Sequence, residues 1–242
     1  MDVMERYYPE SQFGGFTDVD GTIIFHTRVN ALIEPHMVLL DVGCGNAEPR
    51  RHDKVNYRKQ LTSYKGKVKR VIGIDVDEGA RENPFLDEFR LITSNWPIES
   101  ESVDICLCAS VLEHISNPEQ FFGEFQRVLK KDGYLCIHTP NLFNYISIIS
   151  HIIPSNYHAN ILHKVQPGRR EDDIFPTYYK CNTITKLRRI LKTHGFQGVV
   201  YGYDAEPGYL KFSNFAYFFG VLHQRYAPKF FKPVIFVFAK KV

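Results

Sequence analysis

The chain has 242 residues, 44% of them hydrophobic, which is enough to build one α/β domain with a substantial core. Lys and Arg total 30 against 27 Asp and Glu, and the net charge of +3 is too small to indicate a nucleic acid or another polyanionic partner. The five cysteines form no C-x-x-C pair and lie mostly in apolar runs, which is typical of reduced thiols. The sequence shows neither a secretory signal nor an apolar run of membrane-spanning length, so we expect a soluble, cytoplasmic protein.

The first notable motif is "FTDVDGTII" at residues 16–24. Its two aspartates resemble the opening motif of haloacid dehalogenase-like phosphotransferases, in which the first is the nucleophile. That nucleophile follows a buried strand, whereas "SQFGG" precedes this motif, so the sequence argues against a phosphatase. We predict instead a turn at 18–22 and a helix from about residue 23 to 33, which either works as an N-terminal lid or only packs on the sheet. The predicted helix covers the sheet with Ile24, Val29 and Leu32 and turns Phe25, His26 and Arg28 toward the mouth of the site.

From residue 37 onward, short β-rich segments alternate with helical patterns, which is typical of a parallel sheet with crossover helices. Helices are predicted at 117–133, with an apolar stripe and Gly133 as terminator, and at 183–195. The segment 141–182 is too long and too aromatic for a plain connection, so we predict a substrate-facing insertion. Strands are predicted at 37–43, 69–76, 89–93, 103–110, 133–140, 198–204 and 232–242.

The first predicted strand continues into a glycine-containing loop, "VLLDVGCGNAEP" at 38–49. Gly43 and Gly45 permit a sharp turn and allow a ligand to rest against the backbone, at the edge where open α/β sheets bind ligands. The next strand ends with Asp75, and an acidic residue there can accept hydrogen bonds from both hydroxyls of a ribose. The loop and the acidic strand end together indicate a nucleoside ligand.

The segment 94–141 identifies the kind of ligand. Its "WPIESESVD" before the fourth strand and "LEH" after it resemble the central part of class I S-adenosylmethionine-dependent methyltransferases of the broad small-molecule, type 11-like group. The resemblance implies an α/β fold, a Rossmann-like seven-stranded mostly parallel sheet in the order 3-2-1-4-5-7-6 with helices on both faces. It also implies one domain, with a lid at 1–36, a cofactor-binding core at 37–140, the insertion at 141–182 and a C-terminal helix and strand pair at 183–242.

The resemblance also implies which residues meet S-adenosylmethionine. Asp41 would lie near the amino group of the methionine moiety, and Asp75 on the ribose. Ala47 replaces the third glycine of the loop, which counts against a nicotinamide cofactor. Asp41 as a turn cap, Asp75 as a helix cap and Trp96 as a core residue remain alternatives. The remaining cofactor contacts are Gly43 and Gly45 beneath the cofactor, Val76, Asn95 and Trp96 around adenine, and the backbone of Ala109 and Ser110 at the methionine end.

The expected reaction is methyl transfer to a hydroxyl or amine of a small polar molecule, glycosyl-like or a natural-product intermediate, with S-adenosylhomocysteine as product. Because the methyl group is already activated, the protein mainly has to align the acceptor and exclude water. His114 is the first candidate for a general base, with a structural histidine as the alternative, and His138 is a weaker candidate. The clustered ligands of a metal site are missing. The predicted acceptor-binding residues are Asn141, Tyr157, His158, His163, Tyr178 and Tyr179.

The aromatic stretch 209–233 is predicted to be a helix packed in the core before the last strand rather than a membrane contact. Two rival functions stay open at this point: a noncatalytic nucleoside-binding or scaffold protein of the same fold, and a nicotinamide-dependent reductase. Cofactor selectivity and turnover would separate them. The sequence does not identify the acceptor or the oligomeric state.

Overall fold

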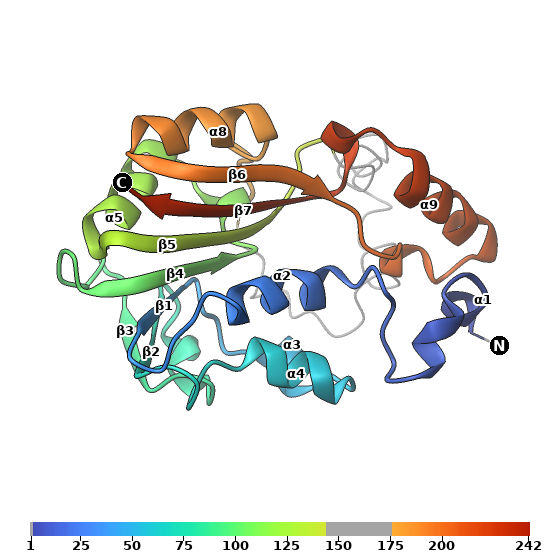
Figure 1. Ribbon diagram of the computed structural model, residues 1–242, viewed down its shortest axis with the longest axis horizontal. Coiled ribbons are helices and arrows are strands. Elements are labelled where there is room, and N and C mark those ends of the chain that lie inside the picture. The colour runs from blue at the N-terminus through green and yellow to red at the C-terminus, as the bar shows by residue number, and fades with distance from the viewer. Residues whose placement is uncertain (1, 144–175) are drawn as a thin grey trace.

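A single seven-stranded sheet organises the molecule (Figure 1). The computed structural model describes residues 2–143 and 176–242. Strands run in the order β3-β2-β1-β4-β5-β7-β6, and only β7 is antiparallel to its neighbours, so the predicted fold class and strand order are confirmed. The strands are β1 (Val38–Val42), β2 (Arg70–Asp75), β3 (Glu88–Leu91), β4 (Val103–Ala109), β5 (Leu129–Pro140), β6 (Phe196–Tyr203) and β7 (Val234–Lys241).

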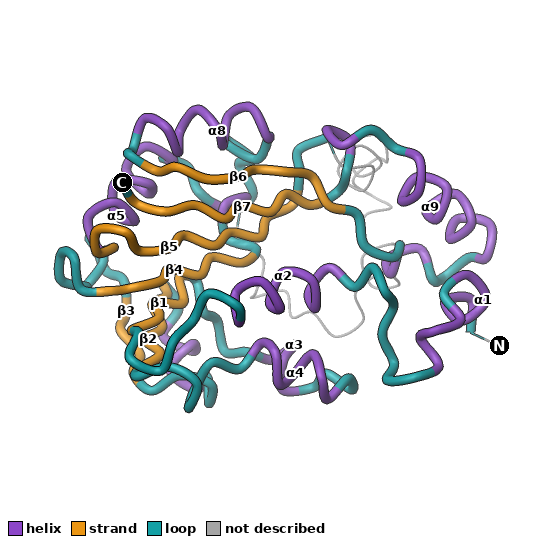
Figure 2. Tube along the Cα trace, in the orientation of Figure 1, coloured by secondary structure: helices purple, strands orange, loops and turns teal. Residues whose placement is uncertain are grey.

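Helices cover both faces of this sheet (Figure 2). The helices α5 and α8 pack on one face, and α2 packs on the other. None of the helices in the described part of the chain is long and apolar enough to cross a membrane. The α-helices are α1 (Val3–Tyr7), α2 (Gly21–Asn30), α3 (Glu48–Arg51), α4 (Asn56–Thr62), α5 (Pro118–Val128), α8 (Ile184–Thr193) and α9 (Asn214–Tyr226).

The central strands are buried on both faces because their side chains alternate between two hydrophobic clusters. In β4, Cys106 and Cys108 face α5 and α8, whereas Ile105 and Leu107 face α2. This double burial explains why the central strands read as continuous apolar runs in the sequence. The five cysteines are all free and buried, and burial raises the pKa of the Cys181 thiol to about 12. They therefore act as small core residues.

The helix predicted at 117–133 is shorter than expected. α5 ends at Val128, and Leu129 already begins β5, so Gly133 is not a helix terminator. A Cβ atom at Gly133 would lie 3.0 Å from the carbonyl oxygen of Asp104, and the β4–β5 register shifts between Val103 and Ile105. Gly133 therefore serves the close approach of two strands at an irregularity.

The N-terminal motif forms the predicted turn, and its second aspartate has a structural role. The carboxylate of Asp20 accepts a hydrogen bond of 2.9 Å from the backbone N–H of Ile23 and so caps α2. Its other oxygen pairs with Arg58, which also pairs with Asp53. Asp20 thus joins α2 to α4 rather than serving a phosphotransfer site.

The orientation predicted for α2 is wrong for two residues. Phe25 is 1% exposed and packs against His138, Phe236 and Phe238 on the sheet. The ring of His26 is also buried, and its Nδ1 lies 2.5 Å from the hydroxyl oxygen of Tyr64. Burial lowers the pKa of His26 to about 3. Both side chains belong to the packing layer because α2 lies flat on the sheet at this point.

The helix α9 packs against the rest of the protein through one face only. Tyr217, Gly220 and Val221 are buried, and Tyr8 joins Tyr217 and Val221 in a small cluster. The aromatic residues on the other side of the helix are exposed, so the core packing predicted for this stretch is correct for half of the helix. The exposed side chains are Phe215, Phe218, Phe219 and Tyr226.

Asn141 was predicted to bind the acceptor, but its amide is used to hold the chain together. The side chain is 1% exposed, and its Nδ2 donates to the carbonyl oxygens of Phe230 at 2.8 Å and Lys232 at 2.9 Å. Its Oδ1 accepts from the backbone N–H of Phe143 at 3.2 Å. Asn141 therefore fastens the end of β5 to the segment that leads into β7.

Replacing Asn141 by Ala should lower the free energy of unfolding by about 2–3 kcal/mol, because two partly buried carbonyl groups lose their donor. Urea denaturation measures this loss as a lower midpoint with an unchanged slope. The matched control is Asn95→Ala, at an exposed asparagine, which should shift the free energy by no more than about 0.5 kcal/mol. An unchanged midpoint for Asn141→Ala would show that the amide contributes nothing to the fold.

Candidate cofactor site

The candidate site lies where β1, β2 and β4 end side by side, at the carboxyl edge of the sheet. Gly43 has a φ of 69°, and a Cβ there would lie 2.3 Å from a methyl carbon of Val111. Gly45 has a φ of 49°, yet no atom lies within 4 Å of its added Cβ. The first glycine is thus required by packing, whereas the second leaves open space in which a ligand can contact the backbone.

The glycine loop is held by hydrogen bonds from two sides. The backbone N–H of Gly43 donates to the carbonyl of Ile74 at 2.8 Å. On the other side, Nδ2 of the buried Asn83 donates to the carbonyls of Cys44 at 3.1 Å and Gly45 at 3.0 Å. No sequence motif indicated Asn83, because its role depends on a contact between residues far apart in the chain. The loop is therefore rigid before any ligand binds.

Asp75 closes the same loop. Its Oδ2 accepts from the N–H of Gly45 at 2.9 Å, and its Oδ1 accepts from the N–H of Asp77 at 3.0 Å. Each carboxylate oxygen has a second lone pair, so these bonds still allow the side chain to accept from two ribose hydroxyls. The role of helix cap, considered above for Asp75, is filled by Asp77. Its carboxylate accepts from the N–H of Gly79 and caps the following turn.

Asp41 lies beside a cation that the sequence reasoning missed. Its side chain is 9% exposed, and Nη2 of Arg50 lies 4.0 Å from its Oδ2. The pKa of Asp41 is raised to about 6, because burial and the nearby Asp75 carboxylate raise it more than the Arg50 guanidinium lowers it. The Arg50 guanidinium also lies 4.9 Å from the centre of the Phe85 ring. The site thus presents a carboxylate and a guanidinium together, which matches the ammonium and carboxylate of an α-amino acid.

The residues predicted around adenine fall into two groups. Val76 is 61% exposed just after β2, and Asn95 is also exposed, so their adenine contacts stay predictions. Trp96 is 7% exposed and packs edge-on against Phe121 and Phe125, with ring centroids 5.3 and 5.0 Å away. This packing favours the alternative role of Trp96 as a core residue.

The end of β4 leads directly to the predicted base. Ala109 pairs with His138 in the sheet, and the N–H of Ser110 donates to the carbonyl of His138 at 2.8 Å. The turn Leu112–His114 follows, in which Nδ1 of His114 lies 3.0 Å from the carbonyl oxygen of Pro176. A carbonyl can only accept, so Nδ1 carries the proton in the neutral ring and Nε2 carries the lone pair.

His138 is in a different environment. Its ring packs 5.6 Å from the ring of Phe25 and 5.4 Å from that of Phe236, on the face covered by α2. Burial lowers the pKa of His138 to about 4. The imidazole is therefore neutral at physiological pH but is a weak proton acceptor, which favours His114 as the base.

A buried polar network connects the second described segment to this edge. Nδ2 of Asn182 donates to Oγ1 of Thr139 at 2.7 Å, and Thr139 donates to Oε2 of Glu113 at 3.3 Å. The carbonyl of Glu113 accepts from the N–H groups of Tyr178 at 2.7 Å and Tyr179 at 3.1 Å. Both predicted acceptor-binding tyrosines are thus held beside the turn that carries His114. The sequence patterns did not single out Glu113, Thr139 or Asn182.

Three predicted acceptor-binding residues, Tyr157, His158 and His163, lie outside the described residues. Within the described ranges, no group of three or more His, Cys, Asp and Glu side chains is placed to hold a metal ion.

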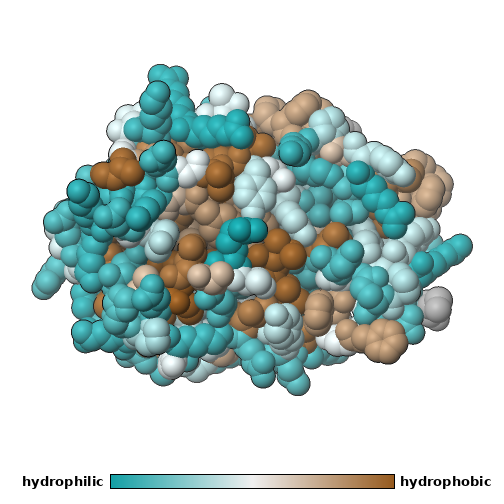
Figure 3. Space-filling model, viewed as in Figure 1, coloured by the Kyte–Doolittle hydropathy of each residue, from teal (hydrophilic) through white to brown (hydrophobic). Residues whose placement is uncertain are grey.

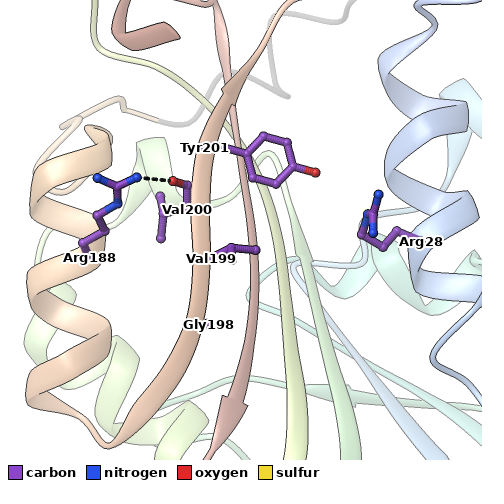
Figure 4. Close-up of a pocket in the computed structure, with 6 residues that line it drawn as sticks. All are labelled: Arg28, Arg188, Gly198, Val199, Val200 and Tyr201. Atoms are coloured by element: carbon purple, nitrogen blue, oxygen red, sulfur yellow. Dashed lines mark hydrogen bonds between the residues drawn. The ribbon is translucent and has the colours of Figure 1, made fainter.

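A hollow on the strand β6 lies apart from the glycine loop (Figure 4). The strands β4, β5 and β7 separate β6 from β1 in the sheet. On one side of the strand, Arg188 of α8 donates a hydrogen bond of 2.9 Å to the carbonyl of Val200. On the other side, Tyr201 and Arg28 of α2 border the hollow (Figure 4). Arg188 therefore covers part of the exposed edge of the sheet. Arg28, which was predicted to face the mouth of the site, borders this hollow instead, so its predicted orientation is also wrong.

Comparison with known proteins agrees with this geometry. Residues 40–137 match the family model described as a methyltransferase domain. A probable S-adenosylmethionine-dependent methyltransferase of Mycolicibacterium smegmatis is 26% identical over 135 residues, which cover 54% of this chain and 44% of that protein. The cyclopropane mycolic acid synthase MmaA2 of Mycobacterium tuberculosis is 23% identical over 130 residues, 50% of this chain and 42% of that protein. The chain thus spans less than half the length of these relatives.

A solved structure shows the same fold over nearly the whole chain. It is a SAM-dependent methyltransferase from Aquifex aeolicus, which superimposes with a TM-score of 0.51 at 18% identity and covers 93% of this chain and 95% of that one. The region matched by the family model contains the end of β1, the glycine loop, Asp75 and the turn that carries His114. Residues 40–137 are therefore similar in sequence to a methyltransferase domain, and the chain shares the fold of this solved methyltransferase.

Proposed function

We propose that the protein transfers the methyl group of S-adenosylmethionine to a hydroxyl or amine of a small polar molecule. The observation that carries this proposal is the arrangement of Asp41 and Arg50 beside a glycine loop that Asp75 holds in place. The fit to the cofactor is chemical. Asp41 and Arg50 would hold the amino and carboxylate groups of the methionine moiety, and Asp75 would accept from the ribose.

The bound cofactor supplies a methyl group already activated on a sulfonium, so the chain's own residues have to hold the acceptor and remove its proton. His114 is placed at the carboxyl end of β4 with Nε2 as its basic atom. Tyr178 and Tyr179 would contact the acceptor near this turn, and Tyr157, His158 and His163 are predicted to complete its binding. We further propose that residues 1–242 form a single domain.

Two ligands separate the roles of Asp75 and Arg50. 5′-Methylthioadenosine contains the nucleoside of S-adenosylhomocysteine but lacks the amino-acid moiety. Asp75→Ala should weaken the binding of both ligands by roughly 10- to 150-fold, since a charged acceptor worth about 1.5–3 kcal/mol is lost. Arg50→Ala should weaken only S-adenosylhomocysteine, by at least about tenfold, because only that ligand has the carboxylate.

Isothermal titration calorimetry measures both affinities, and Arg81→Ala, at an exposed arginine, is the matched control that should leave both unchanged. An equal loss of both ligands in Arg50→Ala would show that Arg50 does not hold the carboxylate. If the unaltered protein binds neither ligand, the proposed function itself is wrong.

The affinity for S-adenosylhomocysteine should fall as the pH drops through about 6, the pKa to which burial raises Asp41. Below that pH the carboxyl is neutral and must lose its proton before it pairs with the ligand's ammonium. Because the ligand binds the charged form of the carboxyl, its affinity decreases with decreasing pH and is roughly tenfold lower at one pH unit below the pKa. Titrations between pH 5 and 8 measure it, with Asp41→Asn as the variant in which the pH dependence disappears.

His114→Ala should lower the turnover of an accepted hydroxyl substrate by about 10²- to 10⁴-fold while cofactor affinity stays within about twofold. The assay follows the formation of S-adenosylhomocysteine across a panel of hydroxylated and amino compounds. His36→Ala is the control, since that histidine side chain is 70% exposed. Unchanged turnover at saturating acceptor would remove His114 from catalysis, and no turnover of any panel member by the unaltered protein would favour a noncatalytic nucleoside-binding role.

A further inference from the structure

The exposed side of α9 forms a continuous aromatic surface, which we call the α9 face. It consists of Phe215, Phe218, Phe219 and Tyr226, of which Phe215 is 74% and Tyr226 77% exposed. The positions follow at i, i+3, i+4 and i+11, so they share one side of the helix. The three phenylalanine rings are in contact, with centroids 4.8 Å apart for Phe215 and Phe219 and 5.5 Å apart for Phe218 and Phe219. Tyr226 lies about two turns further along the helix.

This surface is not the outer side of an ordinary amphipathic helix. The opposite side of α9 is already buried through Tyr217, Gly220 and Val221. A surface helix of a globular protein that packs through one face normally presents polar residues on the other face. Large exposed apolar surfaces of this kind mark interaction sites.

The α9 face is continued by the turns on either side of it. Phe212 before the helix is 59% exposed, and Phe230 after it is 56% exposed. Figure 3 shows apolar side chains gathering on the surface in the upper right of the view, where Figure 1 places α9. The aromatic surface therefore extends beyond a single helix.

The charged side chains on the segment that contains α9 are all cationic, whereas α1, which contacts α9, adds charges of both signs. No Asp or Glu occurs in the sequence from residue 207 to 242, whereas the stretch around α9 contains Lys211, Arg225, Lys229 and Lys232. Lys232 pairs with Asp204. Within the ranges that the structure describes, Arg225 and Lys229 form no salt bridge and both are exposed. Exposed aromatic rings bordered by cations are the chemistry that binds the interface of a bilayer with anionic headgroups.

A second copy of the chain fits this surface less well. A twofold dimer through the α9 face would bring the same cationic border of each copy against the other, and such like-charge contacts are costly. We propose that the α9 face docks the protein on a membrane surface that contains anionic lipid. The sequence prediction of core packing holds for only one side of α9, because apolar residues lie on both sides of the helix.

Docking in this way would place the cofactor site near the membrane. The helices α1 and α9 lie beyond the ends of the strands, at the same end of the molecule to which β4 and β5 point (Figure 1). The α1 helix contacts α9 through the rings of Tyr7 and Tyr217, which lie 5.8 Å apart. The docking proposal does not depend on the methyl acceptor, because it rests on α9 and its borders alone.

Cosedimentation with vesicles tests the proposal on the full chain. The unaltered protein should sediment with vesicles of phosphatidylcholine and 30% phosphatidylserine, and much less with phosphatidylcholine alone. Phe215→Ser/Phe219→Ser should reduce the partition coefficient on the anionic vesicles at least tenfold. Both positions lie on the exposed side, so the thermal midpoint and S-adenosylhomocysteine affinity should match those of the unaltered protein.

A charge-matched pair of variants separates docking from general charge attraction. Arg225→Glu/Lys229→Glu, at the border of the α9 face, should also weaken binding at least tenfold. Arg189→Glu/Lys192→Glu makes the same change in net charge at exposed positions of α8 and should lose less than threefold.

Three results would overturn the proposal: no sedimentation of the unaltered protein with anionic vesicles, equal losses in the two charge variants, or no loss in Phe215→Ser/Phe219→Ser. A dimer in analytical ultracentrifugation that the same phenylalanine variant converts to a monomer would assign the α9 face to self-association instead. All of these measurements use lipid binding or mass, so they can fail while cofactor binding and turnover succeed.

Discussion

The close approach of three chain segments at the end of β1 is the constraint on which the rest of the site depends. Gly43 passes so near Val111 that a Cβ cannot be placed between them. In this position the loop receives hydrogen-bond partners from Ile74, Asn83 and Asp75. Because these partners lie on β2 and on the segment after it, while Val111 follows β4, the loop geometry exists only when the central strands are correctly aligned. The fold and the ligand site are thus determined by the same contacts.

Electrostatics within the site follow from this tight packing. Asp41 is inside the sheet, where burial disfavours its charged form and raises its pKa to about 6. Arg50 offsets part of that cost from 4.0 Å away. A ligand ammonium placed beside Asp41 would complete the compensation, and a ligand carboxylate would do the same for Arg50. The free protein therefore keeps two partly compensated charges that an amino-acid ligand fits, which is how a preorganised site gains affinity.

The sequence was informative wherever the signal was local. Strand positions, the loop after β1 and Asp75 could be predicted because each depends on neighbouring residues and on their place at a strand end. Arg50, Asn83 and the network of Glu113, Thr139 and Asn182 were missed because their roles arise from contacts across the sheet. The end of α5 was misjudged since Leu129 suits a helical stripe and a buried strand equally well.

The two helices whose side-chain orientation was predicted incorrectly, α2 and α9, show what hydrophobic periodicity alone cannot decide. In α2, apolar residues occur on more than one side, so the pattern could not decide whether Phe25 and His26 face the sheet or the site. Only the contacts of Phe25 with the rings of β7 decide it. In α9 the same ambiguity has a different outcome, because both sides of the helix are apolar and only one of them is buried in the fold. An apolar pattern thus predicts that a surface will be covered, while the structure decides whether the protein itself covers it.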